Sequence, residues 1–327
     1  MLHRVILIAF ALIVLLATGS FVRNAVWKDP ATLWGDVVEK SPLRPRAYGN
    51  LCAEYARKNP ARAVEVCSKA LDLNPEYLVG YYNRGAAYSY LGQFDKAIED
   101  YNKAISLAPG YAHYYDNRGT FFFNTGRMKE ALQDYNKAIS LNPSYVNAYF
   151  NRALLYERGG EYKKELEDYN RAIALNPDFV PAYGNRANHY FRRKQFQEAV
   201  ADYSKAISLK PRSAELFNNR GLAYAGMGRY HDAVSDYDRA IAVRPAYAEA
   251  YSNRGAAYLG LKAYDKAVQN YSAMLLLGQR AAHVYANRGV ANYFAGNREA
   301  ALGDLRKACA LGNRPACDMM RKFFKHS

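Results

Sequence analysis

The hydrophobic and polar positions of this chain repeat with a fixed period over most of its length. Between recurring prolines, two stretches place apolar residues three and four positions apart. That spacing is typical of amphipathic helices, because 3.6 residues make one turn. In the second repeat we expect one helix over 79–91 and another over 95–107, separated by Gly92 and ended by proline. The prolines stand 34 residues apart, at Pro75, Pro109, Pro143, Pro177, Pro211 and Pro245.

This pattern indicates a solenoid, because one helix pair cannot bury its apolar stripe alone whereas stacked neighbours can. The order Tyr-x-Asn-Arg-Gly/Ala, then Gly-x-Tyr/Phe, then Asp-Tyr-x-Lys/Arg-Ala-Ile resembles tetratricopeptide (TPR) repeats, with tyrosine replacing a tryptophan of the family, as at Tyr81 and Tyr149. The resemblance implies an all-α fold, a right-handed superhelical solenoid of helix-turn-helix repeats. Eight repeats are expected, at 44–77, 78–111, 112–145, 146–179, 180–213, 214–247, 248–281 and 282–315.

The two ends of the repeat array are expected to carry capping helices, because open repeats expose apolar surface. Within the linker 23–43, Asp29 and Pro30 precede apolar residues at helical spacing and predict a short N-terminal capping helix. At the other end, residues 316–327 predict a C-terminal capping helix.

The first residues of the chain predict membrane insertion. Residues 5–22 contain no charge and are just long enough to cross a bilayer. Residues 1–22 are therefore either a transmembrane anchor or a cleaved signal sequence, and both place the repeats outside the cytoplasm. The segment 22–51 also resembles the last span and linker of multi-spanning glycosyltransferase-like membrane proteins with exported TPR arrays. That resemblance implies a retained anchor, with the repeats on the periplasmic side of the inner membrane if the chain is bacterial.

Each repeat after the first carries an arginine on its first helix and, sixteen residues later, an aspartate on its second, except that the seventh repeat has asparagine there. The first repeat has Leu51 and Val66 instead, so both charges are missing together. This joint loss predicts a structural ion pair, in which the planar guanidinium grips a carboxylate. The alternative is a basic stripe for phosphate or sulfate. The expected pairs are Arg84–Asp100, Arg118–Asp134, Arg152–Asp168, Arg186–Asp202, Arg220–Asp236 and Arg288–Asp304, with Arg254 facing Asn270.

An asparagine precedes each of these arginines and also occurs in the first repeat. In some members of the family that the chain resembles, this asparagine holds the backbone of an extended peptide. The chemistry suits that role, because a carboxamide both donates and accepts a hydrogen bond. The alternative is a structural bond to a neighbouring helix. The candidates for the groove are Asn50, Asn83, Asn117, Asn151, Asn185, Asn219, Asn253 and Asn287, with the aromatic residues Tyr82, Tyr90, Phe123, Phe150, Phe191 and Tyr293 beside them.

The four cysteines fall in two pairs near the ends of the array. Cys52 and Cys67 lie on the two helices of the first repeat, and Cys309 and Cys317 join the last repeat to its cap. Adjacent helices permit two disulfides, Cys52–Cys67 and Cys309–Cys317, in an oxidising compartment. Four buried thiols are the alternative.

The remaining residues predict no chemistry of their own. No catalytic, metal-ligating or phosphate-binding pattern is present, so we expect neither an enzyme nor a cofactor. The net charge of +15 allows attraction to an anionic polymer, although nucleic acid is not the expected partner. Three functions remain: an envelope scaffold that binds an extended protein segment, an accessory subunit of a glycosyltransferase or polysaccharide export system, and a binder of anionic polymer.

Overall fold

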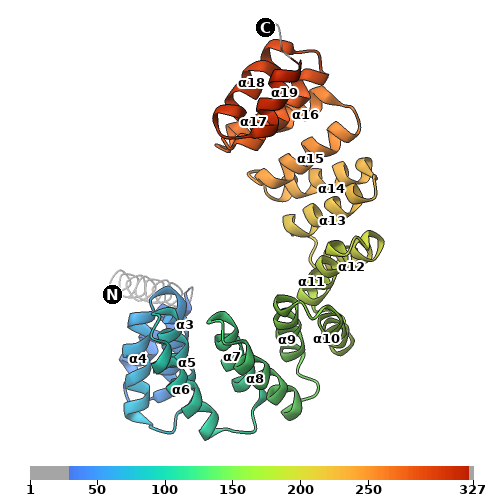
Figure 1. Cartoon of the computed structure of the whole chain (residues 1–327). Helices are drawn as coiled ribbons and strands as arrows, with labels where there is room; N and C mark the ends of the chain where they lie inside the picture. The colour runs from blue at the N-terminus through green and yellow to red at the C-terminus, as the bar shows by residue number, and fades with distance from the viewer. Residues whose placement is uncertain (1–28, 324–327) are drawn as a thin grey trace, which may run out of the picture. The chain divides into compact units, whose positions relative to one another are not determined.

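The computed structural model describes residues 29–323, and within this range every regular element is an α-helix (Figure 1). The predicted span at 5–22 lies outside the described residues, and no helix among the described ones has the length and apolar character needed to cross a membrane. The helices are α2(Pro30–Lys40), α3(Pro45–Lys58), α4(Pro60–Leu73), α5(Leu78–Tyr90), α6(Phe94–Leu107), α7(Ala112–Asn124), α8(Met128–Leu141), α9(Val146–Gly159), α10(Tyr162–Leu175), α11(Val180–Arg192), α12(Phe196–Leu209), α13(Ala214–Gly226), α14(Tyr230–Val243), α15(Ala248–Gly260), α16(Tyr264–Leu276), α17(Ala282–Phe294), α18(Arg298–Ala310) and α19(Arg314–Phe323).

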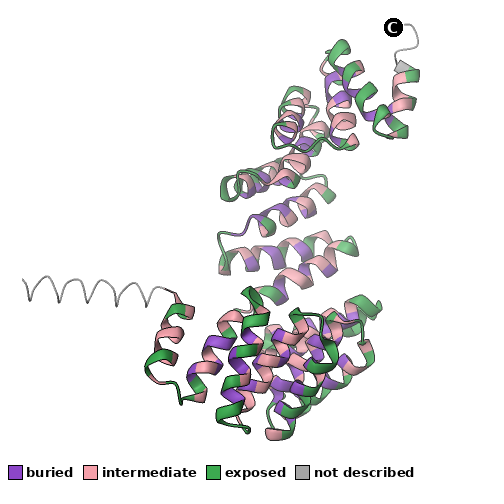
Figure 2. Ribbon diagram, turned by 90° about the vertical axis from the view of Figure 1, so that its left-hand side faces the viewer, coloured by how far each residue is buried: buried purple, intermediate pink, exposed green. Residues whose placement is uncertain are grey.

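The chain forms two compact units, an N-terminal unit of residues 1–155 and a C-terminal unit of residues 156–327. Within each unit the helices pair in chain order, and we call the first helix of a repeat its A helix and the second its B helix. The N-terminal unit contains the pairs α3/α4, α5/α6 and α7/α8, and the C-terminal unit contains α11/α12, α13/α14, α15/α16 and α17/α18. In both units the buried residues are distributed along all the repeats rather than gathered in one centre (Figure 2).

The core of each repeat is built from small residues and one tyrosine. Most B helices bury an alanine in their first turns and a tyrosine four residues later, as at Ala233 and Tyr237, which are 0% and 1% exposed. The facing A helix has Gly221, where a Cβ atom would lie 2.7 Å from the Tyr237 ring. Glycine there lets the two helices approach closely enough to enclose the ring. This repeated core position accounts for six of the 30 tyrosines of the chain: Tyr101, Tyr135, Tyr169, Tyr203, Tyr237 and Tyr271.

The arginine of an A helix joins three helices rather than two, as Arg84 shows. Arg84 on α5 donates from Nε and Nη2 to the two carboxylate oxygens of Asp100 on α6, at 2.8 and 2.9 Å. Its remaining Nη1 donates to Ser68 Oγ on α4 of the preceding repeat, at 3.1 Å. The Tyr81 ring centroid lies 5.6 Å from the guanidinium carbon. One side chain therefore fastens the two helices of its own repeat and also holds the repeat to its neighbour.

The same bidentate contact joins Arg118 to Asp134, Arg186 to Asp202, Arg220 to Asp236 and Arg288 to Asp304. The second partner, sixteen residues before the arginine, is Asn102, Asn170, Ser204 and Ser272 in turn. Arg152 donates to Asn136 in this second way. Its predicted partner Asp168 belongs to the other compact unit, so that pair stays a prediction.

The Arg254 repeat keeps the carboxylate but moves it. Arg254 donates to Asn270 Oδ1 at 2.8 Å, where the other repeats have aspartate. Its Nη1 instead forms an ion pair with Asp238, at the position of Ser68 and Ser204 in other repeats. The guanidinium thus remains neutralised, now by the preceding repeat. The sequence shows Asn270 as an exception, and the structure gives its compensation.

Helices and disulfides close both ends of the array. Asp29 caps α2 by accepting from the Thr32 backbone N–H at 3.2 Å, and α2 packs on α3. Disulfides join Cys52 to Cys67 and Cys309 to Cys317. The first links the helices of the first repeat, and the second ties α18 to the cap α19. Each stabilises a repeat that has a neighbour on one side only.

A double-mutant cycle tests the displaced carboxylate. Asp238→Asn should lower the free energy of unfolding by about 1 kcal/mol, a modest loss because Asp238 is about half exposed and solvent screens its charge. Adding Asn270→Asp should restore stability, because it recreates the arrangement of the other repeats. Urea unfolding of both single variants and the double variant measures the coupling. Simple addition of the two single effects would contradict the proposed exchange of partners.

Candidate peptide-binding face

The candidate binding residues lie on the A helices. Consecutive A helices contact each other in both units, α3 with α5 in the first and α13 with α15 and α15 with α17 in the second. These neighbouring A helices are therefore close enough to present a common surface within their unit, and we call that surface of either unit its A-helix face. Each A helix carries one of the candidate asparagines, and we call these residues the column asparagines.

The column asparagines do not share one environment. Asn83 is 9% exposed and donates to the Gly49 carbonyl of the preceding A helix at 3.1 Å. Asn151 and Asn253 likewise reach back, to Asp116 and Asn218, each at 2.9 Å. These three side chains therefore make the structural hydrogen bond to a neighbouring helix that was the alternative prediction. A role in binding ligand stays a prediction for the column.

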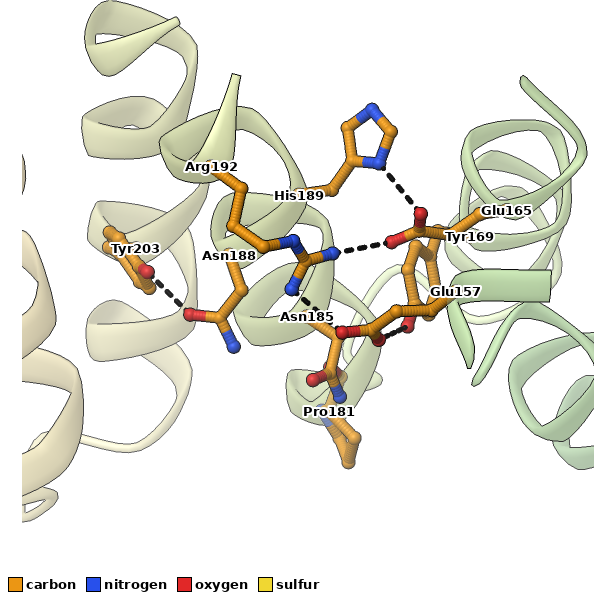
Figure 3. A network of polar contacts seen from close by, with 9 residues as sticks. All are labelled: Glu157, Glu165, Tyr169, Pro181, Asn185, Asn188, His189, Arg192 and Tyr203. Atoms are coloured by element: carbon orange, nitrogen blue, oxygen red, sulfur yellow. Dashed lines mark hydrogen bonds and ion pairs between the residues drawn. The ribbon is translucent and has the colours of Figure 1, made fainter. Parts of the chain in front are cut away.

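The other column members make fewer contacts. Asn185 donates to the Pro181 carbonyl in its own helix at 3.1 Å (Figure 3). Asn219 accepts from Asn218 at 3.2 Å. The rest are half-buried and have no side-chain hydrogen bond within the described part of the chain: Asn50, Asn117 and Asn287. Their amides are available to a ligand.

Two column members line a cavity of about 810 Å³ in the C-terminal unit. Asn218 and Asn219 enter it from α13, and Ser252 and Asn253 enter it from α15. Met274 adds an apolar surface. The cavity is open to solvent, and its lining combines amide groups with a few apolar side chains.

Three amides form a chain in the wall of this cavity. Asn253 Nδ2 donates to Asn218 Oδ1 at 2.9 Å, and Asn218 Nδ2 donates to Asn219 Oδ1 at 3.2 Å. The chain leaves the Asn219 amino group and the Asn253 oxygen without partners among the described residues. If the oxygen and nitrogen of all three side-chain amides were exchanged, the chain would still end in one donor and one acceptor without a partner. The cavity therefore offers both halves of a hydrogen-bonding pair to a peptide group.

The rim of the cavity carries a charged pair. Arg244 forms an ion pair with Glu215, and its guanidinium carbon lies 4.8 Å from the Tyr247 ring centroid. Arg244 and Glu215 neutralise each other, whereas Glu249 also lines the cavity and adds a carboxylate to it. The amide wall remains the main polar feature of the site.

The predicted aromatic residues divide into packed and exposed ones. Tyr82 contacts the rings of His113 and Tyr114 at 5.9 and 5.7 Å, and burial raises its pKa to about 12. Phe191 packs on Phe196, and Tyr293 packs in the cluster around Leu305. Tyr90 is 59% exposed. The half-buried rings of Phe123 and Phe150 also lie on A helices.

A buried charged cluster lies between the fourth and fifth repeats (Figure 3). Glu165 on α10 is fully buried, and its Oε1 accepts from Arg192 at 2.9 Å. His189 Nδ1 on α11 lies 3.0 Å from its other oxygen, Oε2. Arg192 also binds Glu157 at 2.7 Å, and the Tyr169 hydroxyl donates to Glu157 at 3.4 Å. The cluster extends from the core to the half-exposed Arg192 on the A-helix face.

This cluster replaces an apolar contact found in other repeats. The position of Glu165 is otherwise a buried alanine, and the position of His189, 24 residues later, is alanine or a larger apolar residue. Ala199 with Ala223, and Ala233 with Ala257, show the usual contact. Glu165 and His189 both differ from the residues of the other repeats. The sequence therefore contains a signal for this contact, namely two unusual residues 24 positions apart.

The described residues include no group of three or more histidine, cysteine or acidic side chains placed to hold a metal. The site on the A-helix face therefore consists of amides, aromatic rings and paired charges. Such groups support binding through hydrogen bonds and stacking.

The helix-pair architecture and the A-helix face define a solenoid repeat protein of the protein-binding class. Family models described as tetratricopeptide repeat or TPR repeat match residues 79–111, 119–160, 146–179, 187–228 and 226–262. The chain belongs to the tetratricopeptide repeat family.

Solved structures share the fold at low sequence identity. PilW, described as a type IV pilus biogenesis factor, is 23% identical with a TM-score of 0.55, over 63% of this chain and 96% of that one. YrrB, described as a TPR protein with an unusual peptide-binding site, is 24% identical with a TM-score of 0.52, over 57% and 97%.

One curated protein shows a local match. The Hsp70-Hsp90 organizing protein 2 of Arabidopsis thaliana is 26% identical over 80 residues. The match spans 24% of this chain and 14% of that protein, so the likeness concerns a few repeats and leaves most of the relative unmatched.

The buried Glu165–His189 pair gives a stability prediction. His189→Ala should lower the free energy of unfolding by about 3 kcal/mol, because Glu165 remains buried after losing a neighbour of complementary chemistry. The double variant Glu165→Ala/His189→Ala should recover the loss, since it restores the alanine contact of the other repeats. Urea unfolding provides the measurement. A double variant less stable than His189→Ala would contradict this account of the Glu165–His189 contact.

Proposed function

We propose that the chain is a scaffold that binds an extended protein segment along its A-helix face. The observation that carries the proposal is the amide chain in the cavity between α13 and α15, which presents one free donor and one free acceptor. An extended backbone exposes both a C=O and an N–H at each residue, so it matches this pair without requiring a particular side chain. Family membership supports the same role, since the named relatives include a TPR protein with a peptide-binding site.

We further propose that the scaffold works outside the cytoplasm, tethered or exported through residues 5–22. The support is the uncharged apolar run at 5–22 together with two disulfides that join the helices at both ends of the array. Structural disulfides persist in oxidising compartments. Assembly of an envelope complex is the role that fits such a location, and the likeness to a pilus biogenesis factor is compatible with it.

Loss of the Asn219 amino group and the Asn253 oxygen should weaken capture of the natural partner. In crosslinking pull-downs from native membranes, Asn219→Ala/Asn253→Ala should recover about tenfold less of the partner than the unaltered chain. Two hydrogen bonds of about 0.5–1.5 kcal/mol each would account for that factor. Quantitative mass spectrometry of the captured proteins gives the measurement.

The matched control is Gln133→Ala/Gln269→Ala, which removes two exposed carboxamides from B helices. It should capture as well as the unaltered chain, and a thermal melt should show that all variants are folded. Equal recovery by the two double variants would contradict binding through the amide chain. A steep fall in recovery between low and physiological salt would instead favour an anionic polymer as the ligand.

A further inference from the structure

The residue that precedes each column asparagine carries a charge in one repeat only. In the third repeat this residue is Asp116, and its equivalent in the sixth repeat is Asn218. Both are almost fully buried, at 3% and 4% exposed, and both accept from the asparagine 35 residues later. In the other repeats the position holds Gly49, Tyr82, Phe150, Gly184, Ser252 and Ala286. The two units therefore contain the same polar contact, with a carboxylate in one and an amide in the other.

Asp116 has no cationic partner among the described residues. Its carboxylate accepts from Asn151 Nδ2 at 2.9 Å and from the Tyr145 hydroxyl. The carboxylate also interacts electrostatically with the hydroxyl groups of Tyr82 and Tyr135. Burial raises the pKa of Asp116 to about 6, although the hydrogen bonds from Asn151 and Tyr145 oppose the rise. A carboxylate offers about four acceptor positions, and two donors leave part of this capacity unused.

Aromatic rings lie beside this carboxylate on the A-helix face. Tyr82 is half-buried, and its ring lies 5.9 Å from that of His113 and 5.7 Å from that of Tyr114. The face of an aromatic ring attracts a cation, and a nearby carboxylate adds to that attraction. Together these groups are complementary to an ammonium or guanidinium group. The net charge of +15 works against a basic ligand elsewhere, so the attraction is local to this repeat.

We propose that the A-helix face of the N-terminal unit selects a protein segment with a lysine or arginine side chain, which lies against Tyr82 and is attracted by the Asp116 carboxylate. The inference rests on the proposed function and adds the chemistry of the segment. At the equivalent position of the C-terminal unit Asn218 is neutral, so that position adds no such preference. Asp116 acts here as a specificity-determining residue.

Peptide display on the full chain tests this inference. A phage library of random twelve-residue peptides is selected on the unaltered protein, on Asp116→Asn and on Asn218→Asp. The frequency of lysine and arginine among selected peptides should be at least twofold higher for the unaltered protein than for Asp116→Asn. Asn218→Asp places a carboxylate at the equivalent position of the other unit, so its selected peptides should be more basic still.

The pH of selection gives a second, independent measurement. At pH 5 the basic preference of the unaltered protein should fall to that of Asp116→Asn, because the carboxylate is then mostly protonated. Asp116→Asn keeps an acceptor for Asn151, and a thermal melt checks that it is folded. Enriched peptides with equal basic content for the unaltered protein and Asp116→Asn would overturn the inference but leave the proposed function intact. Enrichment of no peptide by any variant would overturn both.

Discussion

The structure depends on one recurring contact, in which an A-helix arginine such as Arg84 holds its own B helix and the B helix of the preceding repeat. A repeat protein has no single core, so its stability is the sum of repeats and the interfaces between neighbours. Arg84 contributes to both terms, since its two carboxylate contacts lie within a repeat and its Ser68 contact lies between repeats. The planar guanidinium suits this task because its donors point in fixed and different directions.

The repeats that depart from the pattern keep their charges satisfied. Asn270 cannot neutralise Arg254, and Asp238 of the preceding repeat supplies the missing carboxylate. Glu165 replaces a buried alanine, and it lies within reach of Arg192 and His189. A buried charge without a partner would be costly, which explains why each of these substitutions is accompanied by a second, compensating one. Asp116 differs, because only neutral groups donate to it.

Much of the fold follows from the sequence. The 34-residue period predicts the helices closely, since the expected helix at 79–91 is α5(Leu78–Tyr90) and the expected helix at 95–107 is α6(Phe94–Leu107). The Arg84–Asp100 contact also follows, because both charges are absent from the first repeat. These contacts lie within one repeat, where spacing along two joined helices determines which side chains meet.

The contacts between repeats could not be predicted in the same way. Whether Asn83 meets a carbonyl, a carboxylate or a ligand depends on how closely two A helices approach, and local spacing does not specify that distance. The pairing of Arg254 with Asp238 and of Glu165 with His189 left traces as paired departures from the consensus. Those paired departures can be interpreted only when it is known that residues 16 and 24 positions apart in the sequence contact each other between repeats. The candidate residues lie on the A helices, the partners of their side chains came from the structure, and their role in binding stays a prediction.

The central functional claim is that a protein segment lies on the A-helix face, and site-specific photo-crosslinking tests it most directly. A benzophenone side chain placed at Ser252, in the cavity wall, is compared with one at the exposed B-helix residue Gln269 in the full chain on its native membrane. The account predicts a discrete adduct with a partner from position 252 and none from position 269. An adduct from position 269 alone, or equal adducts from both positions, would contradict it.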